Sequence, residues 1–175
     1  MKHFKWYILV LFVSASWQVF AQLTSLDELI KEKALNKHGT AKFSVLFWDI
    51  YQSHLWSSGE EYAQDNESHL LKIQYLRDIE RDDLIEKTVE QWQLLNIPEK
   101  RYLPFVSTLK KLWPDINKGD SLALLKTKES STFYYNDKEI GQIDDPYFSE
   151  IFLAIWLSPK TSQPKLREQL IKGKS

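Results

Sequence analysis

The sequence predicts an α+β fold in which helices cover one face of an antiparallel sheet. Segments with strand alternation and segments with helical spacing follow one another in the order strands, helices, strands, helices. Asn136-Asp137 lies between two β-prone runs, which predicts a two-residue hairpin and therefore antiparallel pairing. The amphipathic helices must bury their apolar stripes against one face of that sheet.

Residues 1–21 have the pattern of a secretory signal peptide. A basic start is followed by an apolar stretch, residues 7–13, that is too short to cross a membrane. We expect cleavage after Ala21, which leaves residues 22–175 as a single periplasmic domain with no stable membrane span. An uncleaved amphipathic anchor is the alternative interpretation.

Composition narrows the classes of function. The chain has 175 residues and no cysteine, which excludes disulfides and a lipoprotein anchor. Its formal charge is −1 and it has no basic stripe, so we expect no nucleic-acid partner. There is no glycine-rich phosphate loop, nucleophile elbow or histidine set at metal-ligand spacing, so we expect no cofactor and no metal.

The first half of the chain begins with a short helix within residues 26–35 and continues in extended segments. From Gly39 to Trp56 apolar residues first alternate and then occupy both faces, which predicts one long bent strand or two successive strands. His69 to Arg77 form a further strand. One face of it carries Leu71, Ile73, Tyr75 and Arg77.

Two helices follow this strand. The first is capped by Asp82 or Asp83 and runs to about Leu95. The second covers residues 98–112, with a kink or a late start at Pro104. The acids near the first helix lack the glycine and closing glutamate of a calcium loop, and acids at a helix start favour the helix dipole anyway.

The second half repeats the strands-then-helices order. Asp145 caps the next helix, and Pro146 fits its first turn because no backbone donor is needed there. The expected strands are 121–127, 132–136 and 139–143, and the expected helices are 146–157 and 164–171.

Several motifs occur in order between Gly39 and Ile171. They are Phe47-Trp48-Asp49-Ile50-Tyr51 before Leu55-Trp56, Tyr75-x-Arg77-Asp78, Trp113-Pro114-Asp115 before Gly119-Asp120, Phe133-x-x-Asn136, and a helix ending in Trp156-Leu157-Ser158. This order resembles the bacterial, exported branch of the chalcone isomerase-like family, whose members carry glycine where Ser158 stands.

The resemblance implies an open-faced β-sandwich-like fold, a large antiparallel sheet with helices over one face. It also implies a sheet–helix cleft that is the active site of plant members and holds a fatty acid in others. The plant catalytic tyrosine, asparagine and two threonines fall on or near Leu84, Gln91, Leu46 and Ile155, and the arginine has no counterpart. Of these, Gln91 alone keeps a hydrogen-bonding group. A transition-state oxyanion needs positioned donors, so the resemblance does not predict plant-type isomerase activity.

Three side chains are candidates for ligand binding. Tyr75 and Arg77 end an apolar row, so a hydroxyl and a guanidinium are placed to bind a carboxylate at the mouth of a cleft. Tyr51 is a candidate for the wall of the same cleft. The structural alternatives are that Arg77 pairs with a nearby acid such as Asp49, Asp78 or Glu80, and that Tyr51 is a core ring.

These observations predict a periplasmic, non-catalytic protein that binds a small amphipathic ligand, such as a fatty acid, in the cleft. One alternative is an interaction or assembly module whose cleft is filled by side chains. Another is an isomerase-like enzyme of unknown substrate. The sequence identifies no protein partner.

Overall fold

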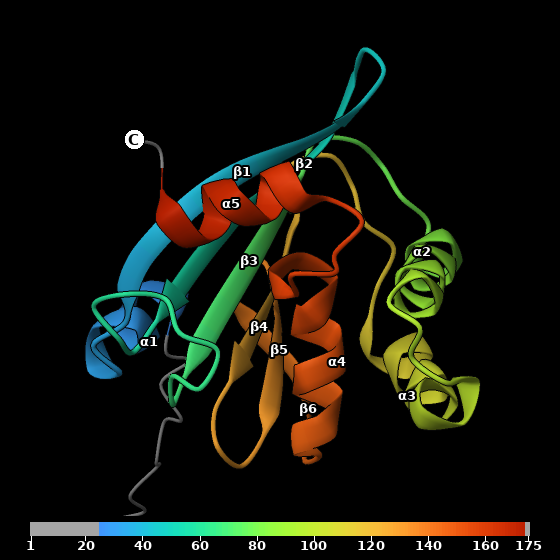
Figure 1. Cartoon of the computed structure of the whole chain (residues 1–175). Helices are drawn as coiled ribbons and strands as arrows, with labels where there is room; N and C mark the ends of the chain where they lie inside the picture. Colours follow the sequence, from blue (N-terminus) through green and yellow to red (C-terminus); the bar gives the residue numbers. More distant parts are fainter. Residues whose placement is uncertain (1–24, 174–175) are drawn as a thin grey trace, which may run out of the picture.

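The computed structural model describes residues 25–173, and the predicted signal peptide lies outside them. Its centre is a six-stranded antiparallel sheet in which each strand pairs with its neighbours in the chain (Figure 1). This meander confirms the predicted fold class. The strands are β1 (Asn36–Val45), β2 (Trp48–Ser57), β3 (His69–Tyr75), β4 (Ser121–Lys126), β5 (Ser131–Tyr135) and β6 (Lys138–Ile143).

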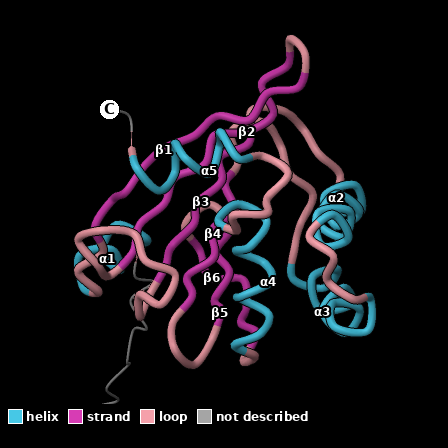
Figure 2. The backbone as a smooth tube through the Cα atoms, viewed as in Figure 1, coloured by secondary structure: helices cyan, strands magenta, loops and turns pink. Residues whose placement is uncertain are grey.

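The helices are α1 (Leu26–Glu32), α2 (Arg81–Leu94), α3 (Glu99–Leu112), α4 (Pro146–Leu157) and α5 (Pro164–Lys172). Figure 2 shows how the helices are arranged about the sheet, and the main apolar core fills the space between one face of the sheet and four of the five described helices, α2 to α5. Helices α2, α3 and α4 pack together, and α5 lies on β1 and β2. Helix α1 packs on the opposite face against Leu70, Leu125 and Tyr134. Within residues 25–173, no helix is both long enough and apolar enough for a membrane crossing.

The extended run from Gly39 to Trp56 is two strands, which settles the alternative that the sequence left open. Val45 pairs directly with Trp48, so Leu46 and Phe47 alone make the turn. Leu46 has a φ of 54°, in the left-handed region. Both turn residues are apolar and neither is a typical hairpin residue, so local sequence does not mark this turn.

The predicted hairpin turn and the predicted helix cap in the second half of the chain are both confirmed. Asn136 and Asp137 have φ values of 47° and 65°, as the predicted two-residue hairpin requires. The carboxylate of Asp145 accepts a hydrogen bond from the backbone N–H of Tyr147 at 2.9 Å and caps α4. Helix α4 begins and ends at the predicted residues.

Helix α2 begins earlier than predicted. Its N-cap is Glu80, whose side chain makes no capping hydrogen bond, and Asp82 and Asp83 lie in the first turn. The predicted cap at either aspartate is therefore wrong. Instead, the Asp115 carboxylate accepts a hydrogen bond from the backbone N–H of Arg81 at 2.9 Å.

Two further boundaries differ from expectation. Helix α3 begins before Pro104 and runs through it, so the predicted late start is wrong. The buried Tyr102 stacks on Trp92 of α2 with ring centres 5.3 Å apart, which holds the first turns of α3 in place. Strand β3 ends at Tyr75, so Arg77 lies beyond it.

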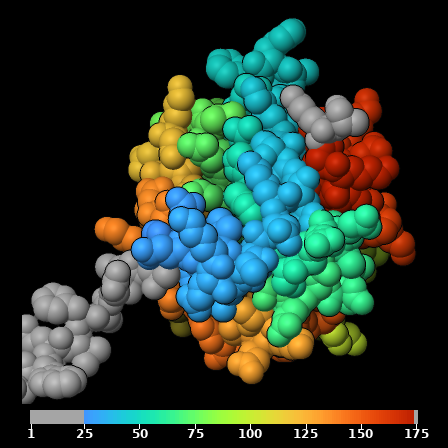
Figure 3. Space-filling model, turned by 90° about the vertical axis from the view of Figure 1, so that its left-hand side faces the viewer, coloured from blue at the N-terminus to red at the C-terminus, as the bar shows by residue number. Residues whose placement is uncertain are grey.

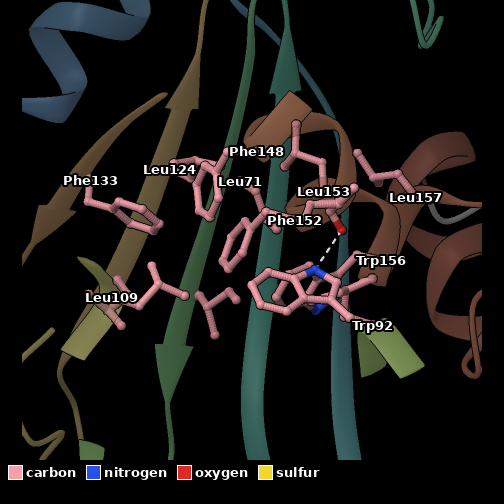
Figure 4. Packing of buried hydrophobic residues seen from close by; sticks show 14 of the residues in the cluster. Leu71, Trp92, Leu109, Leu124, Phe133, Phe148, Phe152, Leu153, Trp156 and Leu157 are labelled. Carbon is pink, nitrogen blue, oxygen red and sulfur yellow. Dashed lines mark hydrogen bonds between the residues drawn. The ribbon is translucent and has the colours of Figure 1, made fainter. Parts of the chain in front are cut away.

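An aromatic cluster beneath α4 holds this helix on the sheet (Figure 4). The rings of Phe148 and Phe152 lie 5.8 and 5.5 Å from that of Phe133 on β5, centre to centre. The indole Nε1 of Trp92 on α2 donates a hydrogen bond to the carbonyl oxygen of Ile151 at 3.0 Å. The sheet, α2 and α4 are thus joined in one core.

The outer strands of the sheet pair irregularly. Strand β1 shifts register on β2 between Lys37 and Gly39 and again between Phe43 and Ser44. The β5–β6 pair shifts register near Phe133. Such bulges bend a strand and increase its twist.

Helix α5 approaches β1 most closely at Gly39. A Cβ atom at this position would overlap the carbonyl oxygen of Gln169 and would lie 2.6 Å from that of Leu170. Both are backbone atoms of α5, so neither can rotate away. Glycine is therefore required where the helix crosses the strand.

We expect Gly39→Ala to lower the free energy of unfolding by about 1–3 kcal/mol, because the added methyl group forces α5 away from β1. Urea denaturation followed by circular dichroism measures this change. Lys42→Ala, at an exposed position on the same strand, serves as the control and should change stability by less than about 0.5 kcal/mol. Equal stabilities of the two variants would contradict the close helix–strand contact.

Candidate functional site

A cavity of about 350 Å³ lies between the helix-covered face of the sheet and the helices α2 and α4. Its volume falls within the range of small-molecule sites, and its wall is mostly apolar. The cavity extends from β5 to Val45 and Ile50 in the β1–β2 hairpin. It occupies the place where the family resemblance predicts a sheet–helix cleft.

Strand alternation builds the floor of the cavity. On β3, Leu71, Ile73 and Tyr75 face the cavity because residues two apart share a face of the sheet. Leu122 and Leu124 continue the floor on β4 by the same rule.

Helical spacing builds the roof. Leu84, Thr88 and Gln91 lie on one side of α2 and line the cavity, at the spacing expected for one helix face. Helix α4 contributes Phe152 and Trp156, whose rings belong to the aromatic cluster (Figure 4).

Tyr51, a predicted binding residue, lines the cavity from β2. Its hydroxyl oxygen accepts a hydrogen bond from Nε1 of Trp156 at 3.0 Å, which connects β2 to α4. Burial raises the pKa of Tyr51 to about 12, so the phenol is neutral at ordinary pH. Since its oxygen is the acceptor in this bond, its own proton remains free to be donated to a bound molecule.

Tyr75, the second predicted residue, also lines the cavity and is only 4% exposed. Its ring centre lies 6.3 Å from that of Tyr51, so the structure brings these two candidates together. Burial, with Tyr51 as a smaller cause, raises the pKa of the Tyr75 hydroxyl, which therefore stays protonated. None of the side-chain hydrogen bonds among residues 25–173 involves this hydroxyl, and the buried polar atom of the cavity wall that lacks a partner there is Nε1 of Trp113.

Arg77, the third predicted residue, is not part of the cavity wall. Its guanidinium carbon lies 6.0 Å from the centre of the Trp48 ring. Because Trp48 pairs directly with Val45, Arg77 lies at the hairpin end of the cavity. In the described part of the chain, no acid pairs with Arg77, so the pairing offered as its structural alternative does not occur there. Its role in ligand binding stays a prediction.

The structure adds a cation that the sequence reasoning missed. Lys87 of α2 lines the cavity, and its Nζ atom lies 2.9 Å from a carboxylate oxygen of Glu90. A hydrogen bond to this carboxylate raises the pKa of Lys87 and keeps it positively charged. The sequence did contain a signal for this position, because Lys87 follows Leu84 at i, i+3 spacing and so lies beside the apolar face of α2. Among residues 25–173, no group of acids and histidines could hold a metal ion.

The positions that match plant catalytic residues are mostly found at the cavity. Leu84, Gln91 and Ile155 line it, whereas Leu46 is 88% exposed at the tip of the hairpin. The side-chain oxygen of Gln91 accepts a hydrogen bond from the Ser162 hydroxyl at 2.6 Å. Three of the four positions that the resemblance matches to plant catalytic residues thus lie at the cavity, and two of these three are apolar.

Comparisons with known proteins agree with this geometry. A curated relative from Haemophilus influenzae, described as an uncharacterized protein, is 22% identical over 133 residues. The match covers 76% of this chain but only 66% of that relative, slightly less than two thirds of its length. The fatty-acid binding protein AtFAP1 of Arabidopsis thaliana has the same fold, with a TM-score of 0.61 at 12% identity. That match covers 78% of this chain and 86% of the Arabidopsis protein.

A family model described as chalcone isomerase-like matches residues 22–172, which includes every strand and helix of the structure. The protein therefore belongs to the chalcone isomerase-like family.

Proposed function

We propose that this protein binds a small amphipathic molecule, such as a fatty acid, in the cavity between the sheet and the helices. The observation that carries the proposal is an apolar cavity of about 350 Å³ whose wall includes Tyr75, a hydroxyl donor that makes no hydrogen bond within residues 25–173. Buried polar groups are nearly always hydrogen-bonded, so an oxygen atom of a ligand is a suitable partner. The fold shared with a fatty-acid binding protein supports this class of ligand.

The polar end of the ligand requires a compensating charge if it is a carboxylate. Burying an ionised carboxylate without a cation is strongly unfavourable. Arg77 supplies a positive charge at the hairpin end, whereas the charge of Lys87 in the wall is already partly balanced by Glu90. The apolar chain of the ligand would then lie on the floor formed by Leu71 and Leu124.

The two alternative functions have less support. An assembly module with a filled cleft does not predict an open cavity under the helices. An enzyme in this cavity would need a base or a set of donors for developing charge. Burial raises the pKa of Tyr51 and of Tyr75, which suits both phenols to donating hydrogen bonds rather than to removing protons.

We also propose that the protein works in the periplasm. The support is the signal-peptide pattern of residues 1–21. Export would place the cavity among the lipids and other amphipathic molecules of the cell envelope.

We expect native mass spectrometry of protein recovered from the periplasm to show a chain beginning at Gln22 that retains or accepts one medium-chain fatty acid. Leu84→Trp should weaken this binding at least tenfold, because the indole occupies the cavity. Leu94→Trp is the matched control, since Leu94 is on the same helix but 61% exposed. A parent protein that takes up no amphipathic molecule, or equal affinity of the two variants, would contradict the proposed site.

We expect Tyr75→Phe to weaken binding of the fatty acid about two- to twelvefold, because one hydrogen bond worth about 0.5–1.5 kcal/mol is lost. Isothermal titration calorimetry measures the two affinities. Tyr134→Phe removes a hydroxyl on the opposite face of the sheet and should leave the affinity unchanged. The same affinity for Tyr75→Phe and the parent would exclude a contact between this hydroxyl and the ligand.

We expect Lys87→Gln and Arg77→Gln each to weaken binding of a fatty acid by about two- to fivefold, the range of an exposed ion pair. Binding of the fatty alcohol of the same chain length should not change, because it has no charge to balance. Competition with a fluorescent fatty acid reports both affinities. If Arg77→Gln binds the acid as tightly as the parent does, the predicted role of Arg77 is wrong.

A further inference from the structure

The β1–β2 hairpin ends in four consecutive apolar residues, Val45, Leu46, Phe47 and Trp48, which we name the hairpin tip. Their side chains are 47%, 88%, 99% and 67% exposed, respectively. Figures 1 and 3 show the hairpin extending beyond the body of the molecule, away from the helices that cover the sheet. Large apolar side chains gathered on a projection usually mark a contact with a partner or a membrane.

We propose that the hairpin tip inserts into the surface of a lipid bilayer.

The turn itself favours this interpretation. Leu46 adopts a left-handed conformation, with a φ of 54°, in a two-residue turn where glycine or asparagine would be less strained. An apolar side chain is present at a position where neither the turn nor the core requires one. Insertion into hydrocarbon would give that side chain an apolar environment.

The base of the tip carries groups suited to the lipid headgroup region. Tryptophan prefers the membrane interface, where its ring is partly apolar and its N–H is hydrated. The Arg77 guanidinium lies 6.0 Å from the Trp48 ring and is available to anionic phosphates. Lys42 and Asp49 form an ion pair of 2.8 Å on the same hairpin and largely neutralise each other. Arg77 is therefore a cation beside the tip that has no such acidic partner among the described residues.

The size of the tip favours a membrane over a protein. A stable protein interface buries roughly 800 Å² on each partner, contributed by about 20–30 residues. Four side chains on a narrow hairpin supply much less. Insertion into a bilayer needs no complementary shape, and its strength depends on the apolar area that enters and on attraction to anionic lipids.

The tip is continuous with the cavity. Val45 belongs to the tip and also lines the cavity, and Ile50, which lines the cavity as well, follows the tip on β2. An inserted tip would therefore place the end of the cavity at the headgroup level, where an amphipathic molecule could pass between bilayer and protein. This exchange depends on the proposed function, whereas insertion of the tip does not.

The absence of cysteine permits a direct test. Phe47→Cys, labelled with the environment-sensitive fluorophore NBD, should show a blue shift and a rise in intensity when vesicles are added. The vesicles contain phosphatidylcholine alone or with 30% phosphatidylglycerol, and the anionic vesicles should give the larger response. Leu103→Cys is the matched control, because Leu103 is 55% exposed on α3, far from the tip in Figure 1, and should show no shift. A labelled tip that does not respond to either type of vesicle would overturn the proposal.

A second pair of variants separates insertion of the tip from adsorption of the remaining protein surface to the vesicle. The double variant Leu46→Gly/Phe47→Ser should bind vesicles at least tenfold more weakly than the parent in co-sedimentation. Its thermal unfolding midpoint should not change, because glycine suits the turn. The control variant Leu94→Ser/Leu103→Ser removes two exposed leucines elsewhere and should bind vesicles as tightly as the parent does. Adsorption through the rest of the surface is then the same in the tip variant and in the control. Vesicle binding by the tip variant equal to that of the parent would overturn the proposal. Self-association of the parent through the tip in lipid-free buffer would overturn it as well.

The tip variant should still bind a dispersed fatty acid with the parent affinity. Loss of vesicle binding with retained fatty-acid binding supports insertion. Vesicle binding without any fatty-acid binding would leave insertion supported and would contradict the proposed function alone.

Discussion

The packing of α4 on the sheet is the constraint on which the rest of the structure depends. Its aromatic side chains contact Phe133 on one side, and its Ile151 carbonyl accepts the hydrogen bond of Trp92 from α2 on the other. The indole of Trp156 donates to Tyr51 on β2. These contacts hold α4 as a roof over the sheet at a fixed height. The cavity is the space that remains between this roof and the strand residues of the floor.

Most of the fold could be predicted because local chemistry and tertiary structure agree there. Asn136-Asp137 and Asp145 specify a turn and a cap through their own backbone and side-chain preferences, and the structure has both. The turn at Leu46 could not be predicted, since its residues are apolar and its conformation is held by the pairing of the two strands. The start of α3 before Pro104 could not be predicted for the opposite reason. Proline locally disfavours a helix at this point, but packing of Tyr102 on Trp92 overrides that preference.

The site was only partly predictable for a related reason. Alternation along a strand shows which residues share a face, so Tyr75 could be placed on the same face as Leu71, and it is at the cavity with Tyr51. Alternation says nothing about where a strand ends, and β3 ends before Arg77. Lys87 was not predicted because its spacing from Leu84 places it only beside the apolar stripe of α2, and which edge of that stripe borders the cavity depends on how α4 packs against the helix.

The register shifts of the outer strands have a consequence for solubility. A meander leaves two unpaired edges, and a straight edge is a template for adding a strand from another molecule. Strand β1 is bent by two bulges and carries Lys37 and Lys42, while β6 begins with Lys138 and Glu139 beside a third irregularity. Charged side chains and bent edge strands therefore disfavour the addition of a strand from another molecule to this six-stranded sheet. They protect a chain rich in aromatic residues against edge-to-edge aggregation.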